Sequence, residues 1–475
     1  MADHGIKVSE VATSVSTPIV ATSGVPFFIG TAPVQSAETP SKVGTPVLCT
    51  SWGEALKKLG YSEDWGKYNL CEAMYSHFQL YGCQPAIFVN LLDTKTMNTA
   101  VSAVDMSVIN RKIKLPLEAI DDVGLIVKAA GGTGSAYEKD TDYAVYYEQG
   151  ECIIEVLADG SIYAATELNV AYNAADASLV TDSLVAVGLE AVDMCMSMIG
   201  IIPDILCAPG FSHLPEVAAI MATKAGGING MFGAKALIDI STDPVDGADD
   251  YSKVVALKNS NNFTDENEIV CWPMLALGDK KFHMSTQLAG LMAYVDTEND
   301  GCPYESPSNK AFKCDSIILA SGEDVILQLA QANILNAGGI VTALGFMGGT
   351  VAWGNYTSCY PVNTDVKDYF VPISRMFDWI GNTEIRTFWT KLDKPMNPRL
   401  RDSIIDTVNI WLNGLVGRGF LLGGRAEMLE DENPLTDLMS GIIRIHNYIT
   451  PPSPAQEINF ILEYDVNYVT SALQG

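Results

Sequence analysis

The sequence has 475 residues, 48% of them hydrophobic, which is enough for two or three domains that each bury a substantial core. Its 57 acidic and 29 basic residues give a formal net charge of −28, which argues against a nucleic-acid groove or an anionic membrane surface as a direct partner. Charged residues make up only 18%, a share that fits either a surface facing other protein or simply a large core.

The first thirty residues carry scattered β-branched side chains without the apolar density needed to pack alone. This predicts an arm that needs a partner, with contacts to other subunits expected at Ile6, Val8, Val11, Val15 and Ile19. The start also lacks the basic-then-apolar pattern of a secretory signal, so a cytoplasmic product is expected.

A globular body is expected to begin with a buried strand over residues 25–30, closed by a turn at 31–33. Ser51 and Glu54 form a capping-box pattern that predicts a helix, and Asn69 opens a second helical run to Phe78. The run over 86–92 reads as the next strand.

Short alternating runs separated by turns fill residues 93–175 and predict a small all-β sandwich or barrel inserted as its own domain. Helical spacing returns over 174–199, and five side chains there are expected to share one buried face: Leu184, Val187, Leu189, Val192 and Met196. A strand from 204, a helix over 214–225 and a strand over 236–240 then predict α/β packing in the resumed body.

Ser321 to Asp324 resembles another capping box and predicts a helix over 325–335, followed by strands over 340–344 and 350–353. Residues 399–416 form an amphipathic pattern whose expected buried side comprises Ile404, Ile405, Val408, Trp411, Leu412 and Leu415.

Two alternating stretches, 442–450 and 458–468, are separated by Pro451-Pro452-Ser453-Pro454, a spacer that stiffens the link and removes amide donors. The last stretch reads as a second arm, able to add a strand to another chain through Ile458, Phe460, Leu462 and Tyr464.

Common catalytic and ligand-binding patterns are absent or incomplete in the sequence. No glycine-rich loop ends in Gly-Lys-Ser/Thr, and the five histidines and ten cysteines show no metal-ligand spacing, so no cofactor or metal is expected. Ser212 and His213 follow a strand, where an α/β enzyme places catalytic groups, but the Gly-x-Ser-x-Gly elbow is missing. Asp296, Glu298 and Asp300 read as a solvated acidic turn rather than a calcium loop.

Several stretches, in order, resemble the contractile tail sheath proteins of phages and phage-tail-like bacteriocins. They are His4-Gly5-Ile6-Lys7-Val8-Ser9-Glu10, Pro18-Ile19, Phe28-Ile29-Gly30-Thr31-Ala32-Pro33, Ser51-Trp52-Gly53-Glu54-Ala55, Ser285-Thr286-Gln287-Leu288-Ala289-Gly290, Asp296, Gly301, Ser306-Pro307-Ser308-Asn309-Lys310, Trp353-Gly354, Asp393-Lys394-Pro395 and the helix through Trp411. The match departs at 355–357, where Asn-Tyr-Thr stands in place of the family's arginine and threonine, and nothing recognisable matches 93–175.

The resemblance implies a subunit that polymerises as stacked hexameric rings around an inner tube and contracts by rigid-body rearrangement, without nucleotide hydrolysis. The implied partners are other copies of the chain, the tail tube protein, and baseplate and terminator proteins, with no direct nucleic acid and no membrane insertion. The implied location is a virion or phage-tail-like particle assembled in the bacterial cytoplasm. Side chains at the start of the 399–416 helix are candidates for the tube contact: Arg399, Arg401, Asp402 and Asp406.

The expected fold is therefore α/β (α+β) and multidomain, a mixed-sheet sheath core with an inserted small all-β domain and extended arms at both ends. The expected division is an N-terminal arm (1–24), a body (25–92 plus 176–320), an outward-facing β domain (93–175), a C-terminal tube-facing domain (321–455) and a C-terminal linking strand (456–475). Two alternatives stay open: a cytoplasmic α/β enzyme with a site in the loop 209–213, and a surface-layer or other shell protein, which would need an export signal.

Overall fold

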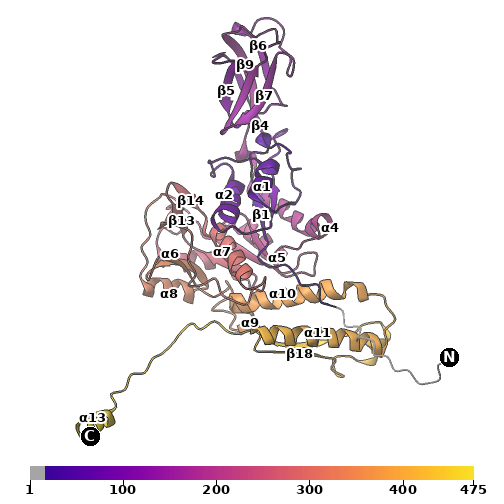
Figure 1. Ribbon diagram of the computed structural model, residues 1–475, viewed down its shortest axis with the longest axis vertical. Helices are drawn as coiled ribbons and strands as arrows, with labels where there is room; N and C mark the ends of the chain where they lie inside the picture. Colours follow the sequence, from indigo (N-terminus) through magenta and orange to yellow (C-terminus); the bar gives the residue numbers. More distant parts are fainter. Residues whose placement is uncertain (1–16, 475) are drawn as a thin grey trace, which may run out of the picture.

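The computed structural model describes residues 17–474, which form three parts arranged along one axis (Figure 1). A β-sheet unit lies at one end, an α/β body in the middle and a layer of long helices at the other end, from which the C-terminal segment leaves the molecule. No helix in the described part of the chain combines the length and the apolar character that crossing a membrane requires.

The body is built on an eight-stranded sheet with the strand order β17-β16-β12-β11-β10-β1-β3-β2, in which only the two edge strands run antiparallel to their neighbours. Its inner strands are continuous apolar runs, as in Phe27-Phe28-Ile29, because helices cover both faces of a parallel sheet. The strands are β1 (Pro26–Gly30), β2 (Val47–Cys49), β3 (Ala86–Asn90), β10 (Ile205–Cys207), β11 (Lys235–Asp239), β12 (Glu268–Cys271), β16 (Ile340–Gly345) and β17 (Thr350–Trp353).

The helices of the body include α7, of which twelve residues are buried, among them Ser285 and Gln287. The helices are α1 (Trp52–Leu59), α2 (Asn69–Met74), which continues as a π-helix (Tyr75–Leu80), α3 (Asp182–Gly188), α4 (Cys195–Ile199), α5 (Pro215–Ala225), α6 (Tyr251–Ser260), α7 (Met284–Glu298) and α8 (Leu329–Ala337). A three-stranded antiparallel sheet lies beside them: β13 (Met274–Leu277), β14 (Lys280–Phe282) and β15 (Ser316–Ile318). Short 3-10 turns occupy Val34–Ser36, Ala130–Gly132, Ala177–Leu179, Leu189–Met194 and Trp389–Lys391.

Residues 98–175 form the β unit, with two antiparallel three-stranded sheets in the orders β4-β9-β6 and β5-β8-β7. It has its own hydrophobic core, which includes Ile113, Val127, Ile154 and Val170. The strands are β4 (Asn98–Ser107), β5 (Lys112–Pro116), β6 (Ile126–Ala129), β7 (Tyr143–Glu148), β8 (Glu151–Val156) and β9 (Glu167–Ala175).

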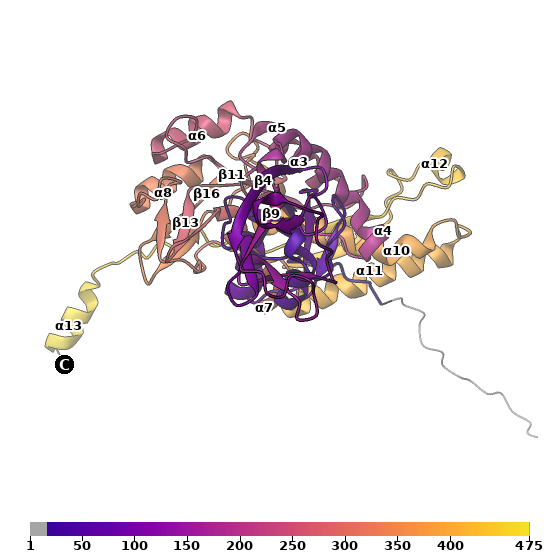
Figure 2. The same cartoon turned by 90° about the horizontal axis from the view of Figure 1, so that it is seen from above.

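The helical layer has a separate core in which Met376, Trp379 and Ile380 of α10 face Val408 and Leu412 of α11. Its elements are α9 (Val366–Tyr369), α10 (Val371–Phe388), α11 (Pro398–Arg418), β18 (Gly423–Glu427), α12 (Leu435–Met439) and β19 (His446–Thr450), and the tail ends in α13 (Val466–Gln474). β18 and β19 pair antiparallel and pack on α11, and α12 projects from the loop between them (Figure 2).

The domain boundary expected at residue 321 does not match the packing. Strand β16 extends the main sheet by pairing in parallel with β12, and Leu335 and Ile340 belong to the body core. Residues 321–353 are therefore part of the body, because the hydrogen bonds between β16 and β12 place them there. The helical layer begins near α9.

Three expected elements need correction. The 325–335 helix begins only at Leu329, where Gln328 and Gln331 form the capping box, because the Val325 N–H donates to the Ile317 carbonyl and extends the strand region instead. In the 174–199 segment, a 3-10 turn interrupts the helix, and Val187 and Met196 are 70% and 39% exposed rather than buried. In addition, α10, the 18-residue helix of the helical layer, was not among the expected elements.

Candidate functional site

The loop 209–213 does not assemble a catalytic pair. Ser212 is fully buried. Its Oγ donates a hydrogen bond to Asp239 Oδ2 at 3.0 Å and accepts one from the Asp239 backbone N–H at the same distance. Asp239 also accepts the Ser285 backbone N–H at 3.0 Å, so its carboxylate ties the loop to α7. Burial lowers the pKa of His213, which keeps that ring neutral near pH 7. The arrangement is a structural network, and nothing in it activates the serine.

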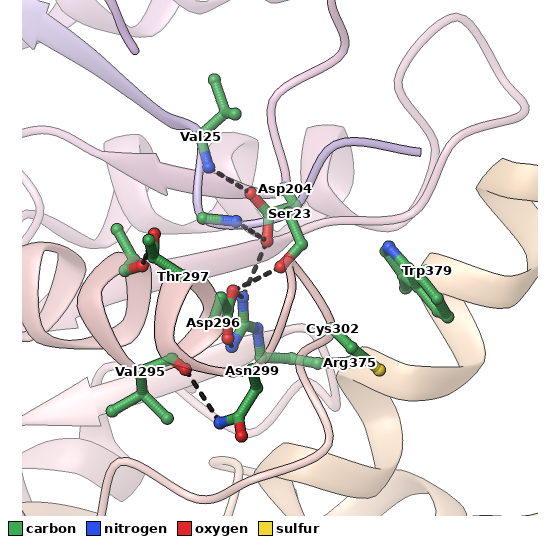
Figure 3. Close-up of polar contacts among 12 residues, drawn as sticks. Ser23, Val25, Asp204, Val295, Asp296, Thr297, Asn299, Cys302, Arg375 and Trp379 are labelled. Carbon is green, nitrogen blue, oxygen red and sulfur yellow. Dashed lines mark hydrogen bonds and ion pairs between the residues drawn. The ribbon is translucent and has the colours of Figure 1, made fainter. Parts of the chain in front are cut away.

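The residues that join the N-terminal arm to β1 are held by two carboxylates, those of the half-buried Asp204 and the buried Asp296 (Figure 3). The backbone N–H groups of Gly24 and Val25 donate to the Asp204 carboxylate at 3.1 and 2.8 Å, and Ser23 Oγ donates to Asp296 at 2.5 Å. Asp296, expected in a solvated acidic turn, is fully buried, because α7 continues past it and packs inside the molecule. That expectation was wrong.

Arg375 of α10 binds both carboxylates at once. Its Nη1 and Nη2 atoms donate to the two oxygens of Asp296 at 3.0 and 2.5 Å, and Nη2 also lies 2.7 Å from Asp204 Oδ2. Burial raises the pKa of Asp296 although the guanidinium opposes that shift, and the pKa of Arg375 is raised by the two carboxylates although burial by itself lowers it. We call these three side chains the carboxylate clasp. It joins the arm, the body and the helical layer.

One face of α10 continues the contact along the arm. The Ala21 N–H donates to Thr383 Oγ1 at 3.0 Å, and the Ile19 N–H donates to Thr387 Oγ1 at 2.9 Å. The Trp379 indole N–H donates to the Ala21 carbonyl at 3.0 Å. The described part of the arm, from residue 17, is thus docked on its own chain, while Ile6, Val8, Val11 and Val15 lie outside the described residues.

The C-terminal arm leaves from the opposite end of α10. Pro451 is buried, the Tyr356 hydroxyl donates to the Gln456 side chain at 2.7 Å, and residues 452–457 line a groove of about 810 Å³ together with Pro372. Beyond the groove, Ile458, Phe460, Leu462 and Tyr464 are 71, 86, 94 and 78% exposed. Residues up to 465 are extended without strand pairing, and the expected strand over 458–468 gives way to α13 from Val466. No part of residues 17–474 buries these side chains.

The four candidates for a tube contact lie at the first turns of α11, where Arg399, Asp402 and Asp406 are exposed and Arg401 pairs with Asp402 at 2.7 Å. The adjoining turn after α10 exposes Trp389 and Leu392 by 56% and 61%. The structure brings these groups together at one end of the helical layer, remote from the clasp. Among residues 17–474, no group of three His, Cys, Asp or Glu side chains is placed to hold a metal ion.

Sequence reasoning missed the clasp. Asp204, Asp296 and Arg375 come from three separate regions, and a lone arginine on an unpredicted helix gives no local signal. The only hint was Asp296, which stands among the residues that carried the family resemblance.

Comparison with known proteins supports that resemblance. No protein-family model matches the chain. The tail sheath protein of Burkholderia phage BcepMu is 26% identical over 492 residues, which cover 99% of this chain and 98% of that protein.

Solved structures share the fold. The helical sheath of the anti-feeding prophage in its contracted state superposes with a TM-score of 0.60 at 15% identity and covers 98% of this chain and 100% of that chain. The contracted sheath of the PVC extracellular contractile injection system gives 0.60 at 13% identity, covering 98% and 99%. The sheath tail protein of Desulfitobacterium hafniense gives 0.56 at 12% identity, covering 94% and 96%. The resemblance to contractile tail sheath proteins and the mixed α/β fold with several sheets are thus confirmed.

Proposed function

We propose that this chain is the structural subunit of a contractile tail sheath, which polymerises as stacked hexameric rings around an inner tube. The particle is a virion or a phage-tail-like device assembled in the bacterial cytoplasm, and the sheath contracts by rigid-body rearrangement without nucleotide hydrolysis. Its partners are other copies of the chain, the tube protein, and the baseplate and terminator proteins.

The observation that carries this proposal is the pair of arms at opposite ends of α10. The N-terminal arm passes Thr387 near the end of the helix, and the C-terminal arm passes Pro372 near its start. The helix has 18 residues and is therefore about 27 Å long. Arms that leave one subunit in different directions suit head-to-tail linkage, which closes into rings or continues as a helix.

The exposed apolar side chains of the C-terminal arm call for a partner. Ile458, Phe460 and Leu462 recur at every second position, the spacing of one face of a strand. A two-stranded sheet such as β18–β19 is marginal alone, and within residues 17–474 both of its outer edges lack a paired strand. An arm of another copy that adds to this hairpin would bury its apolar face and satisfy its backbone.

The test compares the two faces of this arm by electron microscopy of the purified protein. Replacing Ile458, Phe460 and Leu462 by alanine is expected to abolish tubes or stacked rings, because the buried face is lost. The matched control replaces Glu457, Asn459 and Glu463, which alternate with them, and should still polymerise. Normal polymerisation of the apolar variant would exclude strand exchange by this arm.

The tube contact is proposed at the start of α11. Residues 386–406 include the five basic residues Arg386, Lys391, Lys394, Arg399 and Arg401 against the three acidic residues Asp393, Asp402 and Asp406, although the whole chain carries −28. A cationic end on an acidic subunit favours an acidic partner surface. Replacing Arg399 and Arg401 by glutamate should reduce co-sedimentation with tubes, whereas Lys57→Glu in α1 should not. Equal co-sedimentation of both variants would show that the tube contact does not lie at the start of α11.

A further inference from the structure

We propose that the N-terminal arm is held on its own subunit at two strengths, by a permanent anchor at residues 23–25 and by a releasable contact of residues 17–22 with side chains of α10, which we call the rail. The arm can then lengthen while the subunit keeps hold of it. The role of that lengthening in a sheath rests on the function proposed above, but the two strengths of attachment do not, so the two ideas can fail separately.

The anchor is the carboxylate clasp. Gly24 and Val25 donate their backbone N–H groups to Asp204, and Arg375 pairs with Asp204 and Asp296 from a fully buried position. Charge-assisted hydrogen bonds are stronger than neutral ones, and separating this group would leave a buried charge without its partner. Gly24 has φ +68°, and a Cβ there would lie 2.8 Å from the Ala293 backbone, so the chain is also fixed by close packing. The anchor therefore opens only with the fold itself.

The rail is a row of side chains on α10 at positions 379, 383 and 387, four residues apart. Four helical residues rise about 6 Å, and two extended residues span about 6.6 Å. Because these lengths nearly agree, Thr387 accepts the N–H of Ile19 and Thr383 accepts the N–H of Ala21 in turn. The rail thus binds the extended arm through the backbone groups of the arm and not through its side chains.

The rail is weaker than the anchor. The hydrogen bonds of Ile19 and Ala21 join neutral groups, whose net contribution to stability is small because water replaces them on opening. The Arg386 guanidinium adds one longer, exposed bond to the Val20 carbonyl at 3.3 Å. Ile19 and Val20 are 49% and 45% exposed, so little apolar surface is lost when they leave the helix. Ala21 is buried beside Trp379 and is therefore the last contact to open. The arm peels from residue 17 inward and stops at the clasp.

Peeling would release the six residues 17–22, which lengthen the arm by about 20 Å of extended chain. A subunit tied to neighbours at both ends needs such a reserve whenever the bodies move relative to one another. The clasp transmits tension on the arm to α10 and to the main sheet, while the rail determines how much of the arm is released.

Hydrogen–deuterium exchange of the isolated subunit tests the two strengths directly. The amides of Ile19 and Ala21 are expected to exchange at least about tenfold faster than those of Gly24 and Val25. Replacing Thr383 and Thr387 by valine, which keeps their shape, should accelerate exchange at 19–21 severalfold and leave 24–25 unchanged. Equal rates in the wild type, or equal acceleration of both segments, would overturn the proposal.

Locking the rail tests its use in the assembled sheath. Cysteines at positions 19 and 387 should form a disulfide on oxidation, and locked sheaths should assemble but fail to reach the contracted length until reductant is added. Full contraction with the disulfide intact would overturn the proposal that the arm lengthens. Equal hydrogen–deuterium exchange rates at residues 19–21 in extended and contracted sheaths would also overturn it. Absence of any tubes would instead count against the sheath function and leave the subunit result standing.

Discussion

At the scale of single residues, the interior contains two groups whose environment differs sharply from water. His77 lies fully buried in the π-helix beside Phe28 and Phe78, and neither ring nitrogen has a hydrogen-bond partner among the described residues. Burial lowers the pKa of His77 from 6.5 to about 4. His283 shows the opposite balance, since the Glu72 carboxylate outweighs burial and raises the pKa of its ring to about 9.

His77 predicts a specific acid sensitivity. Below pH 6.5 the unfolded chain binds a proton that the folded ring does not, so stability falls as the pH falls toward 4. Between pH 7.5 and 5.5, wild type should lose about 1.3 kcal/mol more than His77→Phe. Urea unfolding of both proteins measures this difference, and the other titrating groups cancel because both proteins share them. Parallel pH profiles would show that the histidine is charged in the fold.

Gly24 predicts a steric requirement at the arm root. Gly24→Ala adds a Cβ 2.8 Å from the Ala293 Cα, whereas Gly44 has a similar φ of +66° and open space around it. Gly44→Ala should therefore cost only the left-handed backbone, about 1–2 kcal/mol. Gly24→Ala should cost more, measured as a larger loss of thermal midpoint. Equal losses would mean that the backbone at Gly24 shifts freely.

At the scale of elements, α11 shows how much a periodic pattern determines. Of its six expected buried residues, Val408, Leu412 and Leu415 are buried, whereas Ile404, Ile405 and Trp411 are half-buried, with Trp411 packed against Trp379. The helix begins where Asn397 accepts the Leu400 N–H and ends at Gly419, whose φ is +81°. Each of these features is local, so the sequence could show them.

The two faces of α11 predict unequal costs. Leu412→Ala should destabilise the subunit by about 2–5 kcal/mol, because it leaves a cavity between α10, α11 and β18. Ile410, on the same helix, is 57% exposed, and Ile410→Ala should change stability by less than about 0.5 kcal/mol. Denaturant unfolding of the two variants checks the orientation of the helix. Similar costs would contradict it.

α10 was not predicted, although its sequence is amphipathic. Its buried face carries polar side chains among the apolar ones: Arg375, Asn382, Thr383 and Thr387. Arg375 belongs to the clasp, Thr383 and Thr387 hold the arm, and Asn382 bonds Gly233 of the body. The partners of these polar positions lie far away along the chain, so the local pattern does not reveal their role.

At the scale of the whole molecule, the β unit is joined to the body through neighbouring strands. Asn98 at the start of β4 lies opposite Ala175 at the end of β9, so the two connections are adjacent. The unit has its own core, and only a few side chains such as Leu117 and Ile120 belong to the body core. This geometry is that of an insertion between two adjacent points of the body.

The geometry predicts that the unit can be removed. Replacing residues 99–174 by a short Gly-Ser linker should leave a cooperatively folded protein, because the linker spans only the distance between paired strands, about 5 Å. The thermal midpoint should fall, since Leu117 and Ile120 no longer cover the body. Calorimetry and electron microscopy check folding and polymerisation. A protein without a cooperative transition would show that the body depends on the unit.

The sequence by itself determined the buried strands β1 and β3, the cap at Ser51, the strand-rich region after residue 93, the face of α11 and the exposed apolar alternation of the C-terminal arm. These depend on neighbours within a few positions along the chain. Tertiary structure alone decided that β16 joins the main sheet and that Asp204, Asp296 and Arg375 meet around residues 23–25. The clasp joins positions up to 352 residues apart, so it leaves no local pattern in the sequence, and its charges are tolerated inside the molecule because each has a partner.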